Sequence, residues 1–76
     1  MARPKYIQDH IDKIGEKVHQ AILNAGYESL YDYRINCDDA LPKSTLSDIV
    51  NGKSDPKIST LLQIARTLKI DVEELL

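Results

Sequence analysis

A row of hydrogen-bonding side chains lies in the middle of the chain. Lys43, Ser47 and Asn51 are spaced four residues apart, and Ser44 and Asp48 fall beside them. On a helix, residues at i, i+4 and i+8 share one face. Donors and acceptors of this kind on one helical face are suited to hydrogen bonding with base edges in a major groove. The pattern therefore points to a recognition helix, provided that the remaining sequence builds one.

The same stretch contains the signals for a short helix with two different faces. Its apolar residues fall opposite the polar row at helical spacing, namely Leu46, Ile49 and Val50. Pro42 suits the first helical position, because its φ is fixed and it has no N–H to leave unpaired. Gly52 offers the left-handed backbone that commonly ends a helix. The sequence thus predicts a helix over residues 41–51.

Four further segments are predicted to be helical and to pack with this one. Apolar residues recur every three or four positions from residue 7 to residue 25, which predicts a helix of roughly five turns. Gly15 interrupts that pattern and would let another helix approach closely. Helices are also predicted at residues 27–36 and 58–68, and a closing helix starts at a capping-box pair, Asp71 and Glu74. Together these patterns predict an all-α, compact five-helix domain that spans residues 1–76.

Length and charge restrict the kinds of partner. The chain has 76 residues, one cysteine and a formal net charge of −2, so an intrachain disulfide is excluded and a structural zinc would lack ligands. Residues 27–40 carry a net charge of −3, whereas residues 41–70 carry +3. The positive charge coincides with the polar helix and its flanks, which favours a polyanionic partner at that place.

Other functional classes find no support in the sequence. No apolar run approaches the length of a membrane span, and the first ten residues lack a signal-peptide hydrophobic region, so we expect a cytoplasmic protein. His10 and His19 do not share a helical face for a metal. There is no nucleophilic motif and no glycine-rich phosphate cradle, so we expect no enzyme activity, no metal and no cofactor. The tyrosines are expected mainly in the core, with Tyr31 and Tyr33 as secondary candidates for phosphate contacts.

From Leu41 to Leu76 the chain resembles the lambda-repressor-like (Xre-type) helix-turn-helix domains. The resemblance is carried by Leu41-Pro42-Lys43-Ser44-Thr45-Leu46-Ser47-Asp48-Ile49, by Asn51-Gly52-Lys53, by residues 56–68 and by residues 70–76. It implies a five-helix lambda-repressor-like fold and binding to double-stranded DNA. It further implies a homodimer whose two recognition helices enter successive major grooves.

The resemblance also implies roles for individual residues. The base-contacting set would be Lys43, Ser44, Ser47 and Asp48, and the set that contacts the DNA backbone would be Thr45, Asn51, Lys53 and Lys57. For each residue a purely structural reading stays open: Ser44 would cap the helix, Asp48 would pair with a lysine, and the lysines would be solvated.

The second predicted helix departs from the family pattern. Counting back from Leu46, Asn36 stands where the family usually has a small alanine, and Ala40 stands at the position of the turn glycine. Asp32 stands where a glutamine often lies near a phosphate, and its negative charge would repel that group. Either this helix is shifted or longer by about a turn, or Asn36 lies in a tight helix crossing.

Two functions follow from these patterns. The first is a sequence-specific transcriptional regulator of the repressor type that occupies an operator as a homodimer. The alternative is an antitoxin or another protein-interaction module of the same fold, with a toxin as partner and DNA binding secondary. The acidic segment at residues 27–40 supports the alternative, and the terminal Leu75 and Leu76 could either complete the core or form a surface for self-association.

Overall fold

The computed structural model describes residues 3–76, so Met1 and Ala2, at the start of the segment searched for a signal peptide, lie outside the described residues. Four α-helices follow in order, and a single turn of 3-10 helix closes the described chain: α1 (Lys5–Asn24), α2 (Leu30–Asn36), α3 (Lys43–Val50), α4 (Ile58–Leu68) and η1 (Val72–Leu75). All regular structure within residues 3–76 is helical, which confirms the predicted all-α class. The predicted fifth α-helix is replaced by the 3-10 turn. In this part of the chain, no helix combines the length and the apolar character needed to cross a membrane.

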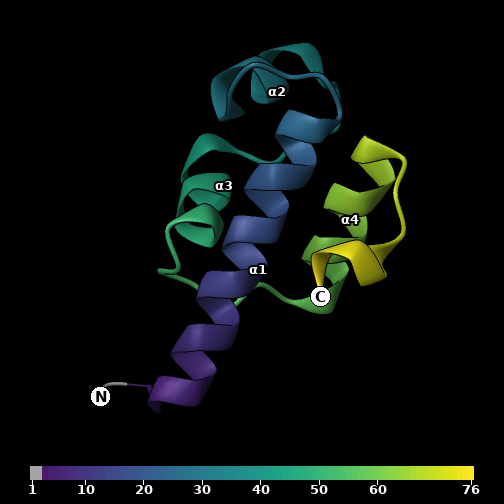
Figure 1. Cartoon of the computed structure of the whole chain (residues 1–76). Coiled ribbons are helices and arrows are strands. Elements are labelled where there is room, and N and C mark those ends of the chain that lie inside the picture. The colour runs from purple at the N-terminus through teal and green to yellow at the C-terminus, as the bar shows by residue number, and fades with distance from the viewer. Residues whose placement is uncertain (1–2) are drawn as a thin grey trace.

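The long helix α1 forms the centre of the molecule. In Figure 1, α3 lies on one side of α1, whereas α4 and the C-terminal segment lie on the other. The core lies against one face of α1 and draws on every other element. Its most deeply buried side chains are Ile11, Val18, Ile22, Tyr33, Leu46, Ile49, Leu61, Ile64 and Leu75. The apolar periodicity of the sequence therefore marks the face of each helix that is buried.

Gly15 allows α1 and α3 to meet backbone to backbone. A Cβ atom at this position would lie 2.5 Å from the carbonyl oxygen of Ile49 and 2.9 Å from that of Val50. Any side chain here would displace the last turn of α3. The predicted close approach at Gly15 is thus confirmed, and the partner helix is α3.

Helix α2 is shorter than predicted. It begins at Leu30 and not near Tyr27, because the Ser29 hydroxyl caps it by accepting from the Asp32 N–H at 3.1 Å. Tyr27 precedes the helix and packs edge-on against Tyr33, with the ring centroids 5.3 Å apart. The predicted helix thus included three residues that belong to the connection between α1 and α2.

Local backbone chemistry fixes the other helix ends. Pro42 is the N-cap of α3 and precedes the first helical residue, one position earlier than predicted. At the other end Gly52 has φ 72°, and the Lys53 N–H donates to the Asp48 carbonyl at 2.8 Å, which closes α3 in a Schellman motif as expected for Gly52. Helix α4 ends at Lys69 in the same left-handed region, with φ 58°. The predicted capping box is present at η1, where Glu74 accepts from the Asp71 N–H at 3.2 Å.

Candidate nucleic-acid interface

Helix α3 has one face in the core and one in solvent. Leu46 and Ile49 are 2% and 1% exposed and hold the helix against the rest of the molecule. The polar residues of the first turn are exposed, namely Lys43, Ser44 and Thr45, and those of the second turn, Ser47 and Asp48, are half-buried. No side chain makes a capping bond at the start of α3, so the structural role considered for Ser44 is not observed. The structure brings the four candidate base-contacting residues together on this helix.

A hydrogen bond joins two members of the polar row. The Asn51 amide donates to the Ser47 hydroxyl oxygen at 3.1 Å, one helical turn apart. This bond uses a lone pair of Ser47 and leaves its O–H free to donate elsewhere. It also orients the Asn51 side chain along α3. A candidate for base contacts, Ser47, and a candidate for backbone contacts, Asn51, are thus hydrogen-bonded to each other.

The cationic candidates follow α3. Lys53 and Lys57 are both exposed, Lys53 directly after the Gly52 turn and Lys57 as the N-cap of α4. Because the first amides of a helix have no intrahelical acceptor, those at the start of α4 are available to an anion. Lys53, Lys57 and the N-terminus of α4 therefore follow α3 in the chain, where contacts to a DNA backbone would be made.

A groove between α2 and α3 adds residues that the sequence patterns did not single out. It encloses about 250 Å³ and is lined by Leu30, Tyr31, Arg34, Lys43, Leu46 and Ser47. The Arg34 guanidinium lies 5.3 Å from the centroid of the Tyr31 ring, a cation–π arrangement. Arg34 therefore adds a second cation to the groove that Lys43 lines. The i, i+3 spacing of Tyr31 and Arg34 was visible in the sequence, but their position beside Lys43 arises from helix packing.

Tyr33 is not available for a phosphate contact. Its side chain is 0% exposed, which corrects the secondary role predicted for it. The Tyr33 hydroxyl lies 2.6 Å from the Thr67 hydroxyl, which itself donates to the Ile64 carbonyl at 2.7 Å. Since Thr67 has a single hydroxyl hydrogen, Tyr33 is the donor in their bond. Burial raises the pKa of the Tyr33 phenol above its ordinary value of 10.0. By contrast Tyr31 is 64% exposed.

Of the two explanations for the departures in the second helix, the structure excludes a tight helix crossing at Asn36. Asn36 is exposed and is the last residue of α2, so it does not lie in a tight crossing. The residue of α2 that enters the core is Tyr33, three positions earlier. The Asp32 carboxylate makes its hydrogen bonds in and next to α2: it accepts from the Glu28 N–H at 2.9 Å and from the Asn36 amide.

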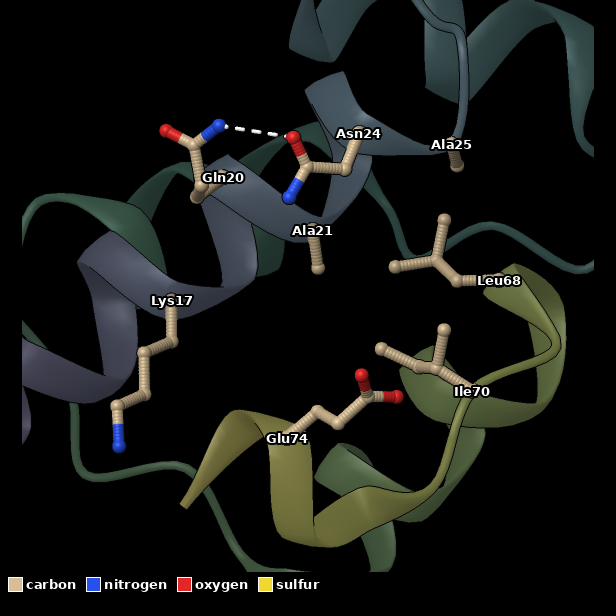
Figure 2. A pocket seen from close by; sticks show the side chains of 8 residues that line it. All are labelled: Lys17, Gln20, Ala21, Asn24, Ala25, Leu68, Ile70 and Glu74. Atoms are coloured by element: carbon tan, nitrogen blue, oxygen red, sulfur yellow. Dashed lines mark hydrogen bonds between the residues drawn. The ribbon is translucent and has the colours of Figure 1, made fainter.

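A second hollow lies on the other side of α1. Its volume is about 380 Å³. Figure 2 shows the side chains that line it, from α1, the end of α4 and the C-terminal segment: Lys17, Gln20, Ala21, Asn24, Ala25, Leu68, Ile70 and Glu74. The Gln20 amide donates to Asn24 at 3.0 Å along the rim. By helical spacing these α1 residues are opposite to Gly15, which touches α3. The hollow is therefore separate from the candidate interface.

Comparison with known families supports the fold of the second half of the chain. A family model described as "Helix-turn-helix" matches residues 39–75, just under half of the chain. Residues 39–75 are thus similar to the lambda-repressor-like helix-turn-helix domains. The resemblance predicted from Leu41 onward is thus confirmed. No curated protein and no solved structure matches the chain.

The helix-turn-helix match begins within the connection that leads to α3. It includes α3, α4 and η1, whereas α1 and α2 lie before it. The connection at residues 37–42 is longer than the three or four residues that usually join the two helices of this motif, and the Ala40 N–H closes a turn in it by donating to the Cys37 carbonyl at 3.2 Å. This family is one of DNA-binding regulators and is generally non-enzymatic.

Proposed function

We propose that the protein is a sequence-specific regulator of transcription that binds double-stranded DNA through α3, and that residues 1–76 act as one helix-turn-helix domain. The observation that carries the proposal is the division of α3. Its apolar side is fixed in the core by Leu46 and Ile49, and its first turn presents three exposed polar residues. A helix held in this way can enter a major groove without exposing apolar surface.

Each polar residue has a role in this proposal. Lys43, Ser44, Ser47 and Asp48 contact base edges, while Thr45, Asn51, Lys53 and Lys57 contact the DNA backbone. Arg34, which lines the groove beside Lys43, adds a further backbone contact from α2. Base contacts confer sequence preference, whereas the cations supply affinity that falls with salt.

The regulator acts as a cytoplasmic homodimer of the repressor type in this proposal. Two copies related by a two-fold axis would place their α3 helices in successive major grooves, and occupation of an operator would exclude polymerase. No cofactor takes part.

A protein partner is the alternative, and an exposed apolar pair on α4 favours it. Ile58 and Leu62 are 57% and 50% exposed and are one helical turn apart. In an antitoxin this face would cover a toxin, and DNA binding would be secondary. The acidic segment before α3 would suit a basic partner.

Fluorescence anisotropy distinguishes the two functions. The full chain is titrated onto labelled fragments of its own upstream DNA and onto a random duplex, at about 50 mM and about 200 mM salt. A regulator binds one fragment tightly and retains its preference at the higher salt. Equal, weak binding to every duplex that disappears at the higher salt would reject the proposal and favour the protein partner.

A further inference from the structure

We propose that Gln8 and Arg3 are positioning residues that hold the turn after α3 in place for the DNA backbone. The inference rests on the proposed function and extends it to a segment outside the matched residues 39–75. The turn consists of Asn51, Gly52 and Lys53, two of which are the proposed backbone contacts.

A chain of hydrogen bonds links α1 to this turn. The Gln8 amide donates to the Gly52 carbonyl at 2.9 Å and to the Asp12 carboxylate at 2.9 Å. The Arg3 guanidinium donates to the Lys53 carbonyl at 3.0 Å and to the Gln8 side-chain oxygen at 2.9 Å. Two consecutive carbonyls of the turn are therefore bound by side chains that also bind each other.

The backbone of the turn packs closely against α1. Gly52 is buried with φ 72°, and a Cβ atom there would collide with the Asp12 carboxylate, so α1 lies directly against it. One face of α1 makes all these contacts, since Gln8, Asp12 and Gly15 are spaced to fall on one side of the helix. At Gly15 the same face meets the last turn of α3. Helix α1 thus supports α3 and the following turn as one rigid surface.

Position matters at this turn because the Asn51 and Lys53 side chains start from it. Recognition requires contacting groups held close to their productive geometry, and a slightly loose supporting shell weakens binding. The bonds from Gln8 and Arg3 fix the carbonyl directions of residues 52 and 53 and hence the course of the backbone between α3 and α4. Neither side chain needs to touch DNA for this effect.

Gln8→Met tests the proposal, with Gln20→Met as its matched control. Both changes remove a glutamine amide from α1 without altering charge, and the Gln20 amide makes a comparable bond, to Asn24 at 3.0 Å, on the side of α1 away from α3. Binding is measured well below the thermal midpoint of each variant, where folding is complete and a purely structural role would leave affinity unchanged.

Gln8→Met is expected to weaken binding by about threefold to tenfold, the loss that one or two net hydrogen bonds give. The loss should be similar on the specific and the random duplex, because the turn contacts backbone. Amide hydrogen exchange at Gly52 and Lys53 should be faster in Gln8→Met than in Gln20→Met. Combining Gln8→Met with Arg3→Met should cost less than the sum of the two, since the residues share one network.

Two results would overturn the proposal. One is wild-type affinity together with wild-type exchange at the turn in Gln8→Met. The other is an equal loss of affinity in both glutamine variants, which would indicate a general effect on α1. If the wild-type protein bound neither duplex, the proposed function would fail, and the exchange comparison alone would decide whether Gln8 holds the turn.

Discussion

Lys43 is the first residue of α3, and its exposed side chain lines the groove that Arg34 also lines. Lys57 is equally exposed but lies at the start of α4. The two lysines have the same chemistry and differ in position, so they separate sequence preference from general affinity. Lys43 is placed at the end of α3 that would contact bases, and Lys57 at a helix start that would contact phosphate.

Lys43→Ala should reduce discrimination between the specific and random duplexes. Each base contact contributes about 1–3 kcal/mol of discrimination, so the preference should fall by about fivefold or more. Lys57→Ala should instead weaken binding to both duplexes alike and reduce the slope of log K against log salt by about 1. Anisotropy titrations over a salt series measure both quantities. A uniform loss from both variants would mean that α3 does not contact bases.

Tyr33 couples stability to alkaline pH. Its pKa is raised by burial above 10.0, so the folded state favours the neutral phenol. The stabilisation of the folded state that this raised pKa gives is fully present below the unfolded-state pKa. It is lost as the pH rises through the folded-state pKa. Tyr33→Phe should cost about 0.5–1.5 kcal/mol at neutral pH, because the bond to Thr67 is lost.

Urea unfolding of wild type and Tyr33→Phe between about pH 8 and about pH 11 checks this expectation. The difference in free energy of unfolding between the two proteins should shrink as the pH rises past about 10. A constant difference across this range would show that the phenol does not titrate differently in the folded state.

Among the elements, α1, α3 and α4 could be predicted from the sequence because each buries a continuous apolar stripe. The start of α2 could not, because Tyr27 continues the apolar pattern, whereas the Ser29 N-cap makes Leu30 the first residue of the helix. The predicted closing helix had correct capping signals but only four residues of helical backbone, which formed a 3-10 turn. The groove between α2 and α3 could not be predicted from the sequence either, because it depends on how the two helices pack and not on the residue pattern within either helix.

Gly15→Ala tests the contact between α1 and α3. Alanine favours helix over glycine by up to about 1 kcal/mol. The added Cβ would meet two backbone oxygens of α3, however, and backbone atoms cannot rotate away as side chains do. We expect a net destabilisation of about 1–3 kcal/mol, measured as a lower urea midpoint at unchanged m value. Lys13→Ala, at an exposed position of α1, should stay within about 0.5 kcal/mol of wild type. A Gly15→Ala protein as stable as wild type would contradict the tight crossing.

The whole molecule has dimensions that suit a two-fold complex on DNA. Its principal extents are 36 × 23 × 20 Å. Half-sites one helical turn apart are separated by about 34–36 Å, which lies within the range that two adjoining copies of this size can span. The net charge of −2 does not oppose this arrangement, because the segment that includes α3 and α4 is positive.

Half-site spacing tests the dimer. Once the operator is mapped, inserting about 5 bp between its halves turns one half-site to the opposite face of the duplex. Binding should then fall to the level of a single half-site, while an insertion of about 10 bp should restore part of the affinity. Sedimentation of the complex would give two protein chains on the native site. Equal affinity for all spacings would indicate that the protein binds as a monomer.

Leu75 is fully buried and shares one core with residues of α1, so the N-terminal helix depends on a residue about fifty positions after its own end. At about 5–20 residues per second, a ribosome adds those positions in roughly 3–10 s. During that interval the apolar stripe of α1 has no complete partner surface. The core that covers the buried face of α1 is therefore complete only after Leu75 has been added to the chain.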